Sequence, residues 1–194
     1  MVLLDIGAVS RPHPGFEENG DAYLVRPYQD GAVLVAVVDA LGHGPEAARI
    51  AEKALDFLSA STTEGLGVLL RGCHEHLKGM RGAAIALVRI EPLPGRLHYC
   101  GVGNVEARLA GQTPARPISY NGIVGAVLPS FKLFDFSFRP GDLLLLHTDG
   151  ISARFNLAAY GDLTGQPAQL IAAAIARDWA RPTDDATILV LRHL

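Results

Sequence analysis

Three segments of this sequence share one pattern, in which an apolar run stands beside aspartate. They are residues 33–45 (VLVAVVDALGHGP), 142–150 (DLLLLHTDG) and 183–191 (TDDATILVL). An unbroken apolar run rich in β-branched residues is typical of a strand buried on both faces, and glycines mark where it ends. Each segment therefore sets a carboxylate at the mouth of a buried strand: Asp39, Asp149 and Asp184. We expect these three ends to meet.

The chemistry that such a set of carboxylates supports is metal binding. Asp21 and Asp185 are further candidates, and no basic residue stands beside the set in the sequence. Carboxylates gathered in one cleft repel each other unless a cation neutralises them. Hard oxygen ligands favour Mg²⁺ or Mn²⁺, and no His/Cys spacing indicates zinc. The glycine turn after Asp39 also leaves the Ala40 carbonyl free to face an ion.

Two ions in this site would support a hydrolytic reaction. Ions about 3.5–4 Å apart can share one carboxylate and a hydroxide, which is then positioned for in-line attack on phosphorus. We expect Asp39 to be the shared carboxylate. The nucleophile would be metal-bound water, and no covalent enzyme intermediate is needed.

A structural explanation competes for each aspartate taken alone, because aspartate is common in turns and at helix N-termini. The Asp149-Gly150 pair alone reads as a turn, and Asp184-Asp185 alone could cap a helix or lie in a solvated loop. The recurrence of one pattern in three segments is what favours a metal site.

The histidines have separate explanations. His43 stands in the glycine turn, where it could donate a proton to the leaving serine oxygen or serve only the structure of the turn. His74 and His76 face opposite sides of a helix, so they are not expected to form a metal pair. His147 stands in an apolar run and is expected in the core.

The elements that must position these residues follow from periodicity. A strand over 22–27, a turn at Gln29-Asp30-Gly31 and a strand ending at Asp39 predict an antiparallel hairpin with Asp21 and Asp39 at one edge. Helices are predicted over 46–58, 63–78 with Thr63 as N-cap, and 167–180. A first strand is predicted at 2–9 and a last strand at 186–192. A series of short strands, expected as an antiparallel meander, is predicted at 83–90, 96–101, 105–110, 123–128, 132–138 and 143–147. Residues 151–163 fit neither pattern.

This order of elements predicts the fold class. Strands flanked by helices rather than alternating with them indicate an α+β domain. We expect a four-layer αββα sandwich over residues 1–194, with two antiparallel β-sheets packed face to face and helices outside.

Composition narrows the function classes. The 194 residues are 49% hydrophobic and 19% charged, which suits one globular domain. A net charge of −3 with scattered basic residues gives no electrostatic footprint for nucleic acid. The two cysteines are expected as reduced core thiols, and no segment looks like a signal peptide or a membrane span. We expect a soluble, cytoplasmic protein that binds neither nucleic acid nor membrane.

The motifs also resemble a known family. Residues 39–44 (DALGHG), 148–150 (TDG) and 184–187 (DDAT), in this order, are similar to those of the metal-dependent PPM-type serine/threonine phosphatases. Within that family the resemblance is closest to the SpoIIE-like branch, in particular to the small single-domain RsbX-type phosphatases of the stressosome. Residues 101–104 (GVGN) and 121–125 (NGIVG) are similar to that group too.

The resemblance implies a role for each candidate. Asp39 would bridge two Mn²⁺ or Mg²⁺ ions, the Ala40 carbonyl would bind one of them, and Asp149 and Asp184 would hold the other. Asp21 matches an acidic position that reaches the site through water. Asp185 falls one place after the ligand position and ranks below Asp184.

Three departures from the family pattern stand out. Ala40 replaces a usual glycine and would be strained if the backbone there needs a positive φ. The arginine that receives phosphate in many relatives has no counterpart at 16–19; Arg11 is the nearest candidate, with a solvated loop arginine as the alternative. The chain between Asp149 and Asp184 is short, so we expect specificity to rest on docking of the partner protein.

The resemblance therefore implies a metal-dependent phosphatase acting on phosphoserine or phosphothreonine of a regulatory protein. The implied partners are phosphorylated STAS-domain stressosome proteins, with dephosphorylation as negative feedback in stress signalling. One alternative is a catalytically weak or inactive binding module with the same fold. Another is a small-molecule phosphoesterase, although the sequence lacks a GxxxxGK[ST] phosphate loop.

Overall fold

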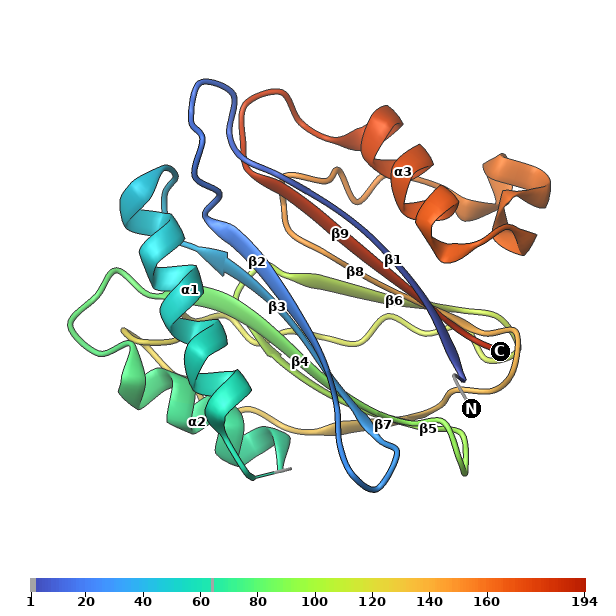
Figure 1. Ribbon diagram of the computed structural model, residues 1–194, viewed down its shortest axis with the longest axis horizontal. Coiled ribbons are helices and arrows are strands. Elements are labelled where there is room, and N and C mark those ends of the chain that lie inside the picture. The colour runs from blue at the N-terminus through green and yellow to red at the C-terminus, as the bar shows by residue number, and fades with distance from the viewer. Residues whose placement is uncertain (1–2, 64) are drawn as a thin grey trace.

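The computed structural model describes residues 3–63 and 65–194 of the chain, and in this part it contains two antiparallel sheets (Figure 1). The five-stranded sheet has the order β2-β3-β4-β5-β7, and the four-stranded sheet has the order β1-β9-β8-β6. The strands are β1 (Leu4–Arg11), β2 (Asp21–Pro27), β3 (Val33–Ala40), β4 (Ala83–Glu91), β5 (Arg96–Val102), β6 (Glu106–Ala110), β7 (Phe134–Ser137), β8 (Leu143–His147) and β9 (Ala186–His193). The helices are α1 (Pro45–Ala60), α2 (Leu66–His76), α3 (Ala168–Trp179) and the 3₁₀ segment η1 (Leu157–Gly165).

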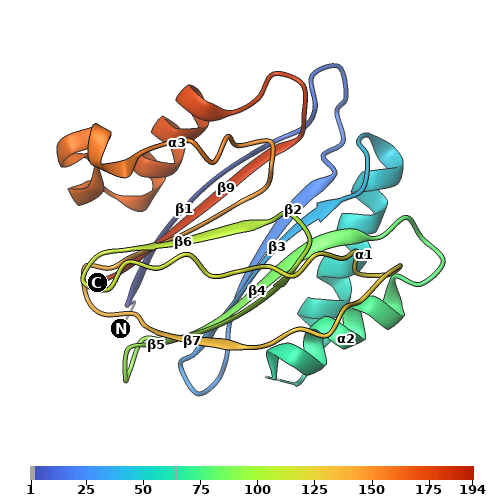
Figure 2. The ribbon, with the colours of Figure 1, turned by 180° about the vertical axis from the view of Figure 1, so that it is seen from behind.

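Three apolar clusters separate four layers. Along β4 the side chains alternate: Ile85 and Leu87 pack under α1 and α2, whereas Ala86 and Val88 pack against the other sheet. A third cluster joins the outer face of the four-stranded sheet to α3. Figures 1 and 2 show α1 and α2 over one sheet and α3 over the other. The predicted αββα sandwich is confirmed.

Helix α3 docks closely on the first strand. The backbone N–H of Ala168, in its first turn, donates a hydrogen bond of 2.8 Å to a carboxylate oxygen of Asp5 in β1. A carboxylate at a helix N-terminus satisfies an amide that has no partner within the helix. Gly7 is required beside this contact, because a Cβ there would lie 2.1 Å from the backbone nitrogen of Gln169. Asp5 therefore serves the fold and lies outside the candidate metal set.

The predicted hairpin is confirmed in its register. Strands β2 and β3 pair antiparallel, with Asp21 directly opposite Asp39. Paired residues in an antiparallel ladder point to the same face, so the two carboxylates share one face of the sheet. The hairpin thus delivers two of the five candidate carboxylates to one edge.

Several local predictions were wrong. Residues 123–128 do not form a regular strand, since Ile123 and Val127 bridge each other and Val124 bridges Ala83. Thr63 does not cap α2, which begins at Leu66 after Gly65. Glu64, in the predicted helix 63–78, and Val2, in the predicted strand 2–9, lie outside the described residues. Only 134–137 of the expected strand 132–138 is regular.

The expected meander is also wrong, because the chain changes sheets repeatedly after β5. Strand β6 joins the four-stranded sheet, β7 returns to the five-stranded sheet and β8 crosses again. The alternating pattern of a strand shows which of its faces is apolar. It does not show which of the two sheets the strand joins, because both sheets present an apolar face to the layer between them.

Two general expectations can be compared with the structure. Cys73 and Cys100 are buried free thiols, as predicted. No helix in the described part of the chain combines the length and the apolar character needed to cross a bilayer.

Candidate metal centre

The candidate site lies at one end of the layer between the two sheets. Along β3, Val35 and Val37 point into this layer, so Asp39, two residues further, points the same way. The facing sheet supplies Thr148 just after β8 and Thr187 in β9. Polar side chains therefore replace apolar ones where the inter-sheet core ends.

Asp21 is fixed by the facing sheet. It is only 5% exposed and accepts a hydrogen bond of 2.6 Å from the Thr148 hydroxyl. Thr148 Oγ1 in turn accepts a bond of 3.0 Å from the Thr187 backbone N–H. Burial raises the pKa of Asp21 to about 7, although the threonine hydroxyls lower it in part. This network ties the two sheets together at the site.

Asp39 has an oxygen without a partner. Its Oδ2 is buried and accepts no hydrogen bond from any described residue. Burial and repulsion from Asp21, Asp149, Asp184 and Asp185 raise the pKa of Asp39 to about 8. Charges that are far apart in a medium of high dielectric constant interact only weakly. Repulsion of Asp39 by all four therefore means that the structure gathers the five predicted carboxylates.

Asp149 and Asp184 are brought together by contact between two turns. Gly150 packs so tightly that a Cβ there would lie 1.7 Å from the carbonyl oxygen of Asp185. Asp149 accepts a hydrogen bond of 2.7 Å from the Asn104 side-chain amide. Burial, followed by repulsion from Asp149, raises the pKa of Asp184.

Asp185 has a different environment from Asp184. It is 4% exposed, and its Oδ1 accepts a hydrogen bond of 2.7 Å from the His13 backbone N–H. This carboxylate therefore anchors the 12–19 loop to the turn before β9. Its ranking below Asp184 as a metal ligand stays a prediction.

The carboxylates do not form a closed ligand cage. Among the described residues, no three His, Cys, Asp or Glu side chains are arranged as a preformed metal-binding group. Like charges at close range repel each other, so tighter convergence requires a cation. The buried, unpartnered Asp39 oxygen and the raised pKa values fit a hard cation, because a cation would supply the missing partner and remove the repulsion.

Ala40 is tolerated where the family usually has glycine. No described residue other than glycine has a positive φ, so alanine is not strained at this position. Ala40 is 1% exposed and ends β3, and its amide donates a bond of 3.0 Å to the Gly20 carbonyl. The objection to its carbonyl as a ligand is removed, and that role stays a prediction.

Arg11 is not a solvated loop side chain. Its guanidinium donates to the carbonyls of Pro12 and Asp184, both at 3.4 Å, and also to the carbonyl of Arg181. These contacts hold the turn that carries Asp184 against the end of β1. Contact of Arg11 with phosphate stays a prediction.

Sequence reasoning missed an aromatic group around His43. The His43 ring stacks on His13, with centroids 4.6 Å apart, and lies 4.7 Å from the Phe16 ring. Gly44 is required here, because a Cβ would meet Phe16 at 2.7 Å and φ is +72°. The 12–19 loop therefore packs over the glycine turn, a contact between loops that no periodicity signals.

Two of the remaining histidines have structural contacts. His147 is 2% exposed, and burial lowers its pKa, which favours the neutral ring expected for a core residue. His74 Nδ1 accepts a hydrogen bond of 2.9 Å from the Gly125 backbone N–H.

The fold and the family comparison define the class of protein. The model of the SpoIIE family, described as Stage II sporulation protein E, matches residues 29–194, and the chain belongs to this family. The protein is thus a PPM-type serine/threonine phosphatase of the SpoIIE branch, and the resemblance drawn from its motifs is confirmed.

Particular relatives agree with this class. The phosphoserine phosphatase RsbX of Bacillus subtilis (strain 168) is 24% identical over 135 residues, 69% of this chain and 67% of RsbX. A solved structure described as "The bacterial stressosome: a modular system that has been adapted to control secondary messenger signaling" is 33% identical, with a TM-score of 0.91 over 97% of this chain and 99% of that one. A crystal structure of RsbX in complex with magnesium is 20% identical and has a TM-score of 0.87 over 98% and 96% of the two chains.

Proposed function

We propose that residues 1–194 form a single domain that hydrolyses phosphoserine or phosphothreonine in a regulatory partner protein, with two Mn²⁺ or Mg²⁺ ions. One observation carries this proposal. A buried Asp39 oxygen has no hydrogen-bond partner among the described residues and faces the repulsion of four other carboxylates. A site with this electrostatic cost is typical of a cation centre.

Each residue has a proposed role. Asp39 would be shared by the two ions, the Ala40 carbonyl would contribute to one, and Asp149 and Asp184 would hold the other. Asp21, held by Thr148, acts through water, and Asp185 fixes the loop beside it. When bound, the ions lower the pKa of a coordinated water and neutralise charge on the phosphoryl oxygens.

The reaction forms a bond from the water oxygen to phosphorus and breaks the bond from phosphorus to the serine oxygen. The leaving oxygen must gain a proton to become the serine hydroxyl. His43 is the proposed donor, because it is exposed in the glycine turn that follows Asp39 and its ring is held by contacts with the rings of His13 and Phe16.

The proposed partners are phosphorylated STAS-domain proteins of a stressosome, and the proposed role is negative feedback in the cytoplasm. Support comes from the relatives, one of which is named a phosphoserine phosphatase and another of which is described with the bacterial stressosome. The alternatives are an inactive binding module and a small-molecule phosphoesterase. The unstrained Ala40 backbone removes one argument for an inactive module.

Hydrolysis of p-nitrophenyl phosphate with added Mn²⁺ tests the proposal. We expect turnover in the parent protein and a loss of at least 100-fold, on the order expected for removal of a metal ligand, in Asp39→Asn. Asp56→Asn, on the exposed face of α1, is the matched control and should retain activity. Faster hydrolysis of a phosphorylated STAS protein than of free phosphoserine would identify a protein phosphatase. Metal-independent turnover, or full activity in Asp39→Asn, would contradict the proposal.

A further inference from the structure

A cavity of about 360 Å³ opens directly beside Asp149. One wall is the segment after β5 together with the start of β6, and the other is the chain at 116–119. The residues that line it include Asn104, Glu106, Arg108, Arg116, Ile118 and Asp149. A peptide whose phosphoserine reached the carboxylates would have this space next to it.

The two arginines of this cavity differ in what they contact. Arg108 donates to the Phe155 carbonyl at 2.9 Å and to the Ala153 carbonyl at 3.2 Å, and its guanidinium lies 4.3 Å from the centroid of the Phe155 ring. Arg116 is exposed, and no hydrogen bond or ion pair joins it to another described residue. Burial, and then the positive charge of Arg116, lowers the pKa of Arg108. Arg116 is therefore the cation that is available to a ligand in this cavity.

A second cavity continues the first. It has a volume of about 620 Å³ and shares Arg108 and Arg116 with the cavity beside Asp149. Its other walls are residues 109–110, 114–115 and 156–158. Arg116 thus stands midway along a groove that leads away from Asp149 across the edge strand β6.

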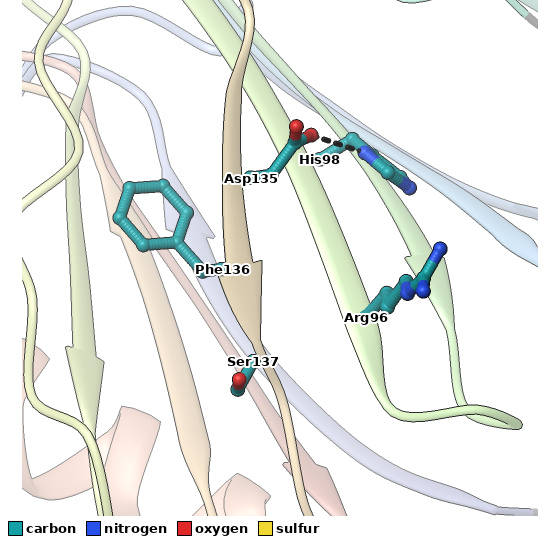
Figure 3. Close-up of a pocket in the computed structure, with 5 residues that line it drawn as sticks. All are labelled: Arg96, His98, Asp135, Phe136 and Ser137. Atoms are coloured by element: carbon teal, nitrogen blue, oxygen red, sulfur yellow. Dashed lines mark hydrogen bonds and ion pairs between the residues drawn. The ribbon is translucent and has the colours of Figure 1, made fainter.

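Two other cavities are less suited to an anionic ligand. On the other side of Asn104, a cavity of about 360 Å³ has no charged lining residue. The cavity of Figure 3, about 310 Å³, contains Arg96 and His98, but His98 is paired with Asp135 at 2.5 Å. Arg96 begins β5, at the opposite end from Asn104.

We propose that Arg116 is a specificity-determining residue that binds an acidic side chain flanking the phosphoserine of the protein substrate. This inference rests on the proposed function. Glu106 also lines the groove, so an acidic substrate segment needs a cation there to offset repulsion. Arginine pairs with carboxylate through two hydrogen bonds, which gives direction as well as charge. Ile118, which is 63% exposed, offers an apolar contact in the same groove.

The test compares three substrates under Mn²⁺: a phosphoserine peptide with glutamates on both sides, the same peptide with glutamines, and p-nitrophenyl phosphate. We expect Arg116→Ala to lower kcat/KM for the acidic peptide about 10-fold, and Arg116→Glu to lower it further. The glutamine peptide should change little, and p-nitrophenyl phosphate should not change. In a separate assay, a fourth substrate, the same peptide with lysines on both sides, should be hydrolysed with a higher kcat/KM by Arg116→Glu than by the parent.

Arg96→Glu is the matched control, because it makes the same charge change at an exposed arginine on the far end of β5. It should leave the ratio between acidic and neutral peptides unchanged. An equal loss on all three substrates in Arg116→Glu, or no loss on the acidic peptide, would overturn the inference.

Binding of the same peptides, measured by fluorescence anisotropy, separates this inference from the proposed function. Weaker binding of the acidic peptide to Arg116→Glu supports the groove even in a protein without turnover. Absence of turnover in the parent contradicts only the proposed phosphatase activity. Equal affinity of the parent and Arg116→Glu for the acidic peptide contradicts only the inferred role of Arg116.

Discussion

At the end of β3, Asp39 lies in surroundings that disfavour its ionised form. The pKa of Asp39 is raised from 3.8 to about 8, chiefly by burial and then by neighbouring carboxylates. A carboxyl group whose surroundings disfavour its ionised form lowers the stability of the folded protein at neutral pH, and such groups are concentrated at functional sites. The simplest physical reason to retain Asp39 is that a cation reverses the sign of its interactions.

Replacing this carboxylate should separate activity from stability. In Asp39→Asn we expect metal-dependent hydrolysis to be lost, while the metal-free protein gains on the order of 1–3 kcal/mol at pH above 8, because a buried unpaired charge is removed. Urea unfolding in the presence of a chelator measures the gain. A less stable metal-free variant would mean that Asp39 makes a favourable contact instead.

Asn104 should act on the metal through Asp149. Its amide donates a bond of 2.7 Å to Asp149 Oδ2, and residues that orient a ligand commonly affect metal affinity about 10–100-fold. We expect Asn104→Ala to weaken Mn²⁺ binding about 10-fold in calorimetry. Asn121→Ala, in the uncharged cavity beside Asn104, should leave the affinity unchanged. Equal affinities for both variants would remove Asn104 from the site.

At the scale of elements, the strands that carry the site could be predicted because each combines a long apolar run with a turn signal. The Asp30-Gly31 turn fixed the hairpin, and antiparallel pairing then set Asp21 against Asp39. The ends of β8 and β9 were located by the same logic. What joins them, the contact of Gly150 with the turn before β9, depends on tertiary packing.

Other elements were beyond sequence reasoning for identifiable reasons. The placement of β6 in the other sheet depends on which of two apolar faces it meets, and an alternating pattern is the same in both cases. His13 and Phe16 stand in an irregular loop, and the contacts that bring them to His43, with Gly44 and with Asp185, are tertiary contacts that no local pattern signals. Arg116 likewise lies in the groove because its neighbour Ala115 forms an isolated bridge with Leu109, a pairing outside the regular strands.

The turn contact predicts the result of a single added methyl group. In Gly150→Ala the new Cβ would meet the Asp185 carbonyl oxygen at 1.7 Å, so one of the two turns must shift. We expect a loss of about 2–3 kcal/mol in the free energy of unfolding together with loss of Mn²⁺ binding, because Asp149 and Asp184 separate.

Gly165→Ala is the control for this variant, since a Cβ there meets nothing within 4 Å and φ is not positive. It should change the free energy of unfolding by less than about 0.5 kcal/mol. Normal Mn²⁺ affinity in Gly150→Ala, measured by calorimetry, would show that the two turns do not need this contact to form the site.

On the scale of the whole molecule, the site lies where two sheets face each other without apolar filling. Thr148 and Thr187 from one sheet meet Asp21 from the other, so the acidic group and the inter-sheet packing share one boundary. Charge repulsion at this boundary opposes the closure of the sandwich, and a bound cation favours it. Stability, pH and metal should therefore be linked in this protein.

The pH dependence has a definite sign. Asp21 and Asp39 have folded-state pKa values raised to about 7 and about 8, whereas 3.8 is the ordinary value. Between about pH 4 and pH 8 the unfolded chain therefore binds fewer protons than the folded chain, and the free energy of unfolding of the metal-free protein should fall as pH rises.

Saturating Mn²⁺ should oppose this fall. The expected stabilisation at 100 times the dissociation constant is about 2.7 kcal/mol, and at fixed Mn²⁺ it should be greater at pH 8 than at pH 6, because protons compete with the ion for the same oxygens. Denaturant unfolding across this range, with Mn²⁺ or with chelator, measures both trends. In Asp39→Asn the metal-free curve should flatten, since one raised titration is gone. A parent protein whose metal-free stability is constant from pH 5 to pH 8, within about 0.5 kcal/mol, would show that burial and the neighbouring carboxylates do not raise the pKa values of Asp21 and Asp39 in the folded chain.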